Sequence, residues 1–197
     1  VDVHTYDLLH IALYPYNTRD SAYAFLLALR SKGYHPRVVV TDLRRDYGTV
    51  IALVFPKARH HECLFHAEQE IGRYLRKTWG RDYAEQQPEA ELLRAAVVRI
   101  FQARTKRTAQ KRYHALLEQK EDYLQRAPPL LWVFAFLDKH WPTLVNATEC
   151  DLIPATNALG YSPDICSYLT SDVGAYLKQK TPLVDAFKMA GIPRADV

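Results

Sequence analysis

Asp42 is the first residue whose type and position suit it to chemistry. It follows the run Arg37-Val38-Val39-Val40-Thr41, whose β-branched residues predict a central strand. A carboxylate just past the carboxyl end of a buried strand lies where open α/β sheets bind their ligands. One carboxylate cannot hold a pair of metal ions, because two-metal phosphoryl transfer needs several. The alternative interpretation is that Asp42 caps a helix over residues 43–54.

A second group combines histidine and cysteine: His60, His61, Cys63 and His66. Cys63 and His66 have the C-x-x-H spacing of metal ligands, and zinc is the metal that mixed Cys and His ligands favour. A structural zinc site needs four ligands, and the sequence shows no second pair downstream. The alternative is a short strand or turn over 59–66 in which Cys63 and Phe65 face inward.

A third group is basic and lies in the middle of the chain: Arg94, Arg99, Arg104, Lys106, Arg107, Lys111 and Arg112. Such a surface can neutralise phosphates without reading a base sequence. Glu118, Glu121 and Asp122 offset part of this charge. The alternative is an ordinary solvated helix surface.

The elements expected to position these groups alternate at first between strands and helices. Residues 8–14 predict a strand, and Asp20 or Ser21 is expected to cap a helix that stops at Gly33. After the strand before Asp42, a second helix contains Tyr47, Val50, Ile51 and Val54 and is closed by Pro56. This order favours an α/β fold, with helices packed against a sheet.

From about residue 67 to 140 helical periodicity dominates. The expected helices cover 67–78, a segment through Leu93 and Phe101, a segment from Tyr113 to Leu124, and the apolar run 130–137 after two prolines. We place a boundary near Asn157. Residues 158–197 are rich in glycine and proline and are expected to be a poorly packed tail.

Composition is that of a globular protein: 197 residues, 48% hydrophobic and 24% charged, with a formal net charge of +4. This basic balance is compatible with a nucleic-acid partner. Three scattered cysteines exclude a disulfide framework. The sequence predicts neither a signal peptide nor a membrane span, so the cytoplasm is the expected location.

Three segments together resemble DDE-type transposases of insertion sequences, close to the Mutator-like group. Residues 38–66 resemble the region of the second catalytic aspartate, with matches at Thr41-Asp42, Tyr47, Phe55-Pro56, Ala58, His60, Cys63 and His66. Residues 1–29 resemble the preceding strand, turn and helix. Residues 153–157, Ile-Pro-Ala-Thr-Asn, resemble the segment that leads to the third carboxylate. The likeness covers about residues 1–157.

This resemblance implies a ribonuclease-H-like core with a large helical insertion, and magnesium-dependent cleavage and transfer of DNA strands. Asp42 is the one member of the acidic triad that it transfers, as a magnesium ligand. It also implies DNA as partner, with the basic residues 99, 104, 106, 107, 111 and 112 as candidate contacts. A functional transposase is further expected to be a homo-oligomer.

Two departures from the family pattern lead us to expect an incomplete core without cleavage activity. The first acidic residue belongs to a strand before Val1, and Asp2 lies on the next strand. The third, a glutamate, does not follow Asn157; Glu149 precedes the motif, and Asp164 is a poor substitute. The sequence therefore predicts a transposase fragment and leaves open whether it is an enzyme.

Two further hypotheses remain. Residues 159–177 resemble a segment of the 2-hydroxyacyl-CoA dehydratase and benzoyl-CoA reductase family, in which a matching cysteine, here Cys166, ligates an iron–sulfur cluster; the other cluster ligands have no counterpart. A junction between two unrelated genes explains both likenesses. The other hypothesis is a non-enzymatic DNA-binding module stabilised by zinc at Cys63, His66 and His60.

Overall fold

The computed structural model describes residues 9–10, 12, 14–16 and 18–148. The chain divides into two units, Val1–Asn157 and Ala158–Val197, and all described residues belong to the first of them. The predicted tail, including Cys166, lies outside the described residues.

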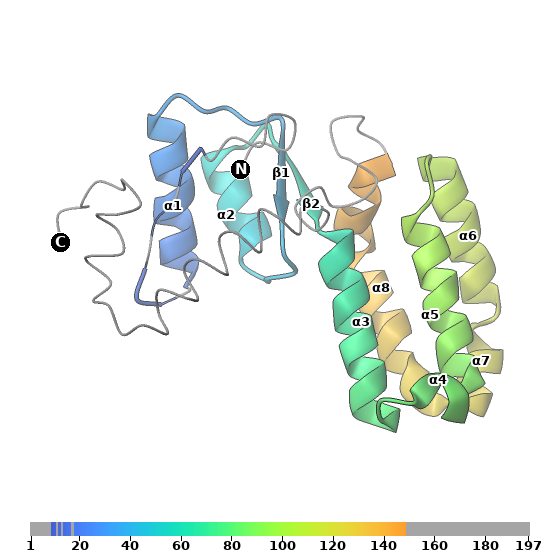
Figure 1. Ribbon diagram of the computed structural model, residues 1–197. Coiled ribbons are helices and arrows are strands. Elements are labelled where there is room, and N and C mark those ends of the chain that lie inside the picture. The colour runs from blue at the N-terminus through green and yellow to red at the C-terminus, as the bar shows by residue number, and fades with distance from the viewer. Residues whose placement is uncertain (1–8, 11, 13, 17, 149–197) are drawn as a thin grey trace. The chain divides into compact units, whose positions relative to one another are not determined.

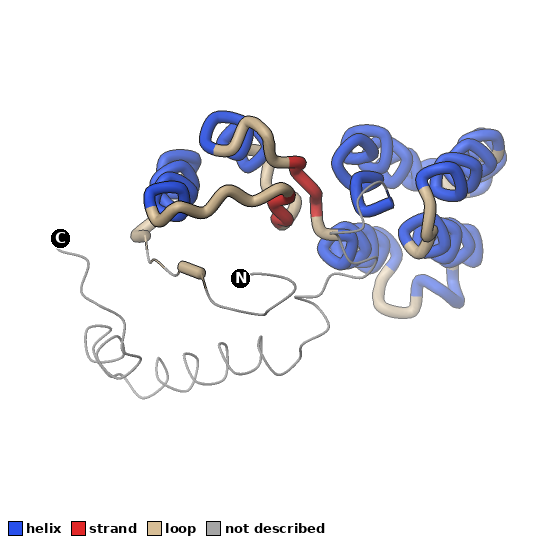
Figure 2. The backbone as a smooth tube through the Cα atoms, turned by 90° about the horizontal axis from the view of Figure 1, so that it is seen from above, coloured by secondary structure: helices blue, strands red, loops and turns tan. Residues whose placement is uncertain are grey.

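The described part of the chain is a mixed α/β structure that is mostly helical (Figure 1). Its elements are α1 Arg19–Ser31, β1 Val38–Thr41, α2 Tyr47–Val54, β2 Arg59–Glu62, α3 Leu64–Trp79, α4 Tyr83–Gln86, α5 Pro88–Phe101, α6 Lys106–Glu118, α7 Lys120–Arg126, η1 Pro128–Leu130, α8 Leu131–Leu144 and η2 Val145–Thr148. In Figures 1 and 2 the two strands lie between the α1–α2 pair and a block of helices from α3 to α8.

Helix α1 begins two or three residues earlier than the sequence suggested. Its N-cap is Thr18, whose Oγ1 accepts a hydrogen bond from Ser21 N at 3.2 Å, while Ser21 Oγ accepts from Thr18 N at 2.8 Å. This reciprocal capping box satisfies two amides of the first turn, so the expectation that Asp20 or Ser21 is the cap was wrong. The helix ends at Ser31 with Lys32 as its C-cap, and Gly33 follows with a φ of 86°, so the prediction that Gly33 stops this helix is confirmed.

The two strands form a parallel sheet in which Val38 pairs with Arg59 and Thr41 with Glu62. Helices α1 and α2 pack together through a small apolar core made of Ala22, Leu26, Val50, Ile51, Val54 and Phe55. The strand predicted over 8–14 is not present at its described residues 9, 10, 12 and 14. His10 instead stacks on Phe25 of α1, with ring centroids 4.9 Å apart.

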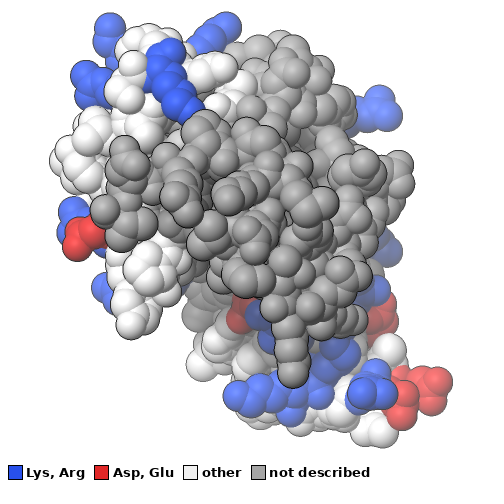
Figure 3. Space-filling view, turned by 60° about the vertical axis from the view of Figure 1, so that its left-hand side comes forward, with Lys and Arg blue, Asp and Glu red and all other residues white. Residues whose placement is uncertain are grey.

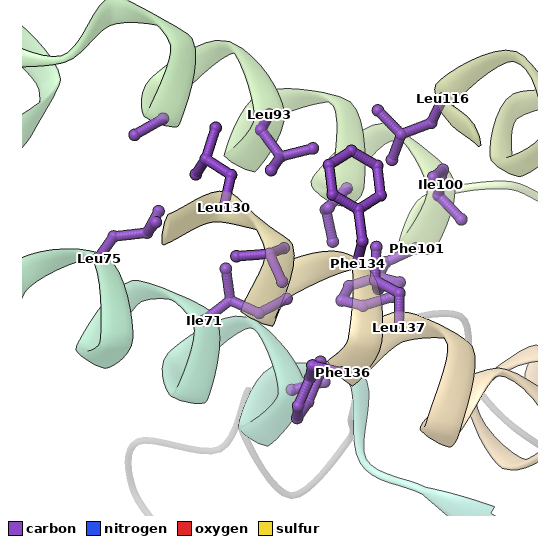
Figure 4. Packing of buried hydrophobic residues seen from close by; sticks show 14 of the residues in the cluster. Ile71, Leu75, Leu93, Ile100, Phe101, Leu116, Leu130, Phe134, Phe136 and Leu137 are labelled. Atoms are coloured by element: carbon purple, nitrogen blue, oxygen red, sulfur yellow. The ribbon is translucent and has the colours of Figure 1, made fainter. Parts of the chain in front are cut away.

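The larger core belongs to the helical block (Figure 4). Leu75, Leu93, Leu130 and Leu137 converge there from four different elements and are fully buried. The segment from Tyr113 to Leu124 is not one helix, as expected, but two, because α6 ends at Glu118 and α7 begins at Lys120.

Helix α8 runs beyond the predicted apolar stretch and continues through Pro142 to Leu144. The pair Pro128-Pro129 forms the short helix η1 in front of it, as prolines favour a first helical turn. Tyr74 of α3 donates a hydrogen bond to Pro129 O at 2.8 Å and stacks on Trp132 at 4.2 Å. These contacts fix the start of α8 on α3.

Candidate functional site

Asp42 lies directly after β1, at the carboxyl edge of the parallel sheet, and its side chain is exposed. Its Oδ1 accepts a hydrogen bond from Arg44 N at 3.1 Å. This is the pattern of a local Asx turn, in which an aspartate bonds the backbone two residues on. Helix α2 begins only at Tyr47, so the alternative prediction that Asp42 caps this helix was wrong.

The backbone of Asp42 is held by its neighbour. Thr41 Oγ1 lies 2.8 Å from Asp42 O and 2.8 Å from His60 Nε2. Because the hydroxyl carries one proton, which it donates to the carbonyl, the imidazole Nε2–H donates to the hydroxyl. Burial lowers the pKa of His60, against the opposing effect of the Glu62 carboxylate. His60 thus joins β2 to the end of β1.

A buried group of polar side chains joins β2 to α8, and the sequence did not predict it. Glu62 Oε2 lies 2.7 Å from His140 Nδ1 and 2.6 Å from Thr143 Oγ1, and the Glu62 and His140 side chains are each only 9% exposed. The strand and the helix are therefore connected through a buried carboxylate that accepts two hydrogen bonds.

Two neighbours extend this connection. His61 Nδ1 donates to the carbonyl oxygen of Thr143 at 2.9 Å, and Asn146 Nδ2 donates to His60 O at 2.6 Å. The second bond satisfies a carbonyl of β2 that faces away from β1. An edge strand needs such cover, because its unpaired groups otherwise invite other strands. We call Glu62, His140, His61, Thr143 and Asn146 the β2–α8 joint.

The joint makes stability depend on pH. Burial lowers the pKa of His61 to about 4 from an ordinary value of 6.5. Between these values the unfolded chain binds a proton that the native protein does not, so unfolding free energy falls as pH drops from 6.5 toward 4, by at most about 1.4 kcal/mol per pH unit. We expect urea unfolding to show a shallower pH dependence in His61→Gln than in the wild type. Equal slopes in the two proteins would contradict the assignment.

Cys63 and His66 interact at the start of helix α3, and the contact joins the Cys63 side chain to the His66 backbone, not the two side chains to each other. Cys63 is the N-cap, and its Sγ accepts a hydrogen bond from the backbone N of His66 at 3.4 Å. Burial raises the pKa of the Cys63 thiol, whereas the His66 side chain is exposed. No group of three or more His, Cys, Asp or Glu among the described residues is placed to hold a metal ion. The expected inward direction of Phe65 was wrong, because this ring is 42% exposed.

The predicted basic residues lie at the connection between α5 and α6, and six of them are exposed there. We call these six the α5–α6 basic surface: Arg99, Arg104, Lys106, Arg107, Lys111 and Arg112. The Arg112 guanidinium donates to the backbone oxygen of Arg99 and so ties the two helices together. Arg94 is not part of this surface, because it pairs with Glu91 at 2.7 Å and Glu68 at 3.3 Å.

The β2–α8 joint had only weak signals in the sequence. His140 follows Phe136 by four residues and Leu137 by three, so the helical period places it on the buried face of an apolar helix. A buried histidine needs a partner, but the period does not say which. Cys166 lies outside the described residues, so its role as a cluster ligand stays a prediction.

Comparison with known proteins adds no assignment: no family model, no curated protein and no solved structure matches this chain. Within the described residues, every helix is too short or too polar to cross a membrane.

Proposed function

We propose that this chain is part of a DNA transposase of the DDE type, with a ribonuclease-H-like core, and that it binds DNA without cleaving it. The observation that carries the proposal is the position of Asp42, an exposed carboxylate at the carboxyl edge of a parallel sheet. This is the edge at which open α/β sheets bind ligands.

The order of the elements supports the same proposal. The resemblance implies a helical insertion after the second aspartate, and α3 to α8 follow Asp42 as a helical block with its own core. His60, another motif residue, hydrogen-bonds to Thr41 beside Asp42. Two residues of the resembling segment, Thr41 and His60, are thus in contact beside Asp42.

The carboxylates of the described residues do not fit a complete magnesium site. Asp42 is one oxygen donor, and Glu62, the acidic residue of β2, is already the acceptor for His140 and Thr143. Two-metal chemistry needs several converging carboxylates. We therefore derive no cleavage step, and we propose DNA binding as the activity of this chain.

Two assays on the purified full chain test the proposal. In gel-shift experiments we expect it to retard duplex DNA. With magnesium and supercoiled plasmid we expect no nicking above background, and Asp42→Asn should bind DNA as tightly as the wild type. Failure to bind DNA would refute the proposed function. Magnesium-dependent nicking that is lost in Asp42→Asn would refute the inactivity while supporting the family.

A further inference from the structure

We infer that the α5–α6 basic surface binds the phosphate backbone of duplex DNA without reading its base sequence. The inference rests on the proposed function and deepens it by naming how DNA is held. Its first support is charge: residues 99–112 include six basic and no acidic residues, and all six basic side chains are exposed. These six basic side chains lie on the last turn of α5, the loop after it and the first two turns of α6, and such a concentration of basic residues attracts a polyanion.

Other basic side chains of the helical block have acidic neighbours. Residues 70–85 around the end of α3 contain Arg73, Arg76, Lys77 and Arg81 but also Glu70, Asp82 and Glu85. Arg73 pairs with Glu70. On the face drawn in Figure 3, acidic side chains adjoin basic ones at the right of the lower end. The stretch 99–112 differs because its sequence supplies positive charge alone.

The first turn of α6 adds to this concentration of charge. Lys106 and Arg107 occupy its first two positions, and no acidic residue lies in this turn. The amino end of a helix carries partial positive charge, so basic residues there cost stability. Along α6 a side chain four residues on, as Lys111 is from Arg107, lies about 6 Å further along the axis. Arg107 and Lys111 therefore lie on the same face of α6, one turn apart, where both can contact phosphates.

The residues between the cations decide which polyanion fits. Single-stranded nucleic acid is bound by exposed aromatic rings on which bases stack. The only aromatic residue within 99–112 is Phe101, which is 8% exposed and belongs to the core. An anionic membrane would need exposed apolar side chains to enter the interface, and Ile100, Ala103 and Ala109 are likewise buried. A purely cationic surface fits the backbone of a duplex.

Salt dependence of binding tests this inference without any need for cleavage. Each phosphate contact contributes about −0.9 to the slope of log affinity against log salt concentration. We expect the triple variant Arg104→Gln, Arg107→Gln, Lys111→Gln to lower the slope by about 2–3 and to weaken binding at least about tenfold. Two fluorescent duplexes of unrelated sequence should respond alike. Arg112 is left unchanged because it contacts the backbone of α5.

The matched control removes the same charge elsewhere, with Arg76→Gln, Lys77→Gln and Arg81→Gln. The three residues replaced in each variant are exposed, so neither variant should disturb the fold. We expect the control to keep the slope of the wild type. Equal losses of slope and affinity in both variants would overturn the inference, and so would no loss in either variant. In both cases the proposal that the chain binds DNA would still stand. Tighter binding to a single strand, or to phosphatidylserine vesicles, would overturn the choice of partner.

Discussion

Replacing Glu62 by alanine is expected to destabilise the protein by about 1–3 kcal/mol, the usual cost of leaving a buried hydrogen-bonding group without its partner. The substitution leaves His140 Nδ1 without the acceptor that lies 2.7 Å from it, whereas the Thr143 hydroxyl keeps the carbonyl oxygen of His140 at 2.9 Å. Buried donors that lose their partner keep the whole cost of having left water.

Urea unfolding followed by circular dichroism measures this effect. Glu118→Ala on α6 is the control, because this side chain is exposed, and we expect it to change stability by less than about 0.5 kcal/mol. Glu62→Gln keeps a hydrogen-bond acceptor and should fall between the two. A Glu62→Ala protein as stable as the control would mean that the β2–α8 joint is not formed.

Leu137→Ala is expected to cost about 2–5 kcal/mol, because it opens a cavity in the core of the helical block. This leucine is fully buried, and its side chain points into the cluster that Figure 4 shows. Helix α8 supplies its own control in Leu131, which is 53% exposed. Leu131→Ala changes the same atoms on the same helix.

The two leucine variants share their change in helix propensity, so the difference between their unfolding free energies reports burial. We expect Leu131→Ala to cost less than about 1 kcal/mol, since exposed apolar side chains contribute little. Equal effects of the two substitutions would show that α8 presents a different face to the core.

Local patterns predicted the elements that local forces define. The β-branched run Val38–Val40 forms a strand because such residues favour extended backbone, and the spacing of Tyr47, Val50, Ile51 and Val54 corresponds to α2 because it matches the helical period. Asp42 was correctly placed after β1 for the same reason. The alternation in 8–14 predicted a strand that the described residues of this segment do not show.

The β2–α8 joint could not be derived in the same way. Glu62 and His140 are 78 residues apart, and no local period connects them. Strand β2 reads Arg-His-His-Glu, which lacks the apolar alternation of a half-buried strand. His61 and Glu62 contact α8, so these two polar residues of β2 become buried only through packing between distant segments. The N-cap of α1 was also not predicted correctly, because Thr18, Asp20 and Ser21 are all of residue types that cap helices.

The distance in sequence between β2 and α8 also has a consequence for synthesis. A ribosome adds about 5–20 residues per second, so the 78 residues between Glu62 and His140 take about 4–16 seconds to make. During this interval α8 has not yet been synthesised, so the edge of β2 that faces away from β1 is uncovered. An uncovered strand edge can pair with another nascent chain. Charged residues in a strand discourage such pairing. The side chains that later close the joint therefore protect the unfinished chain from aggregation.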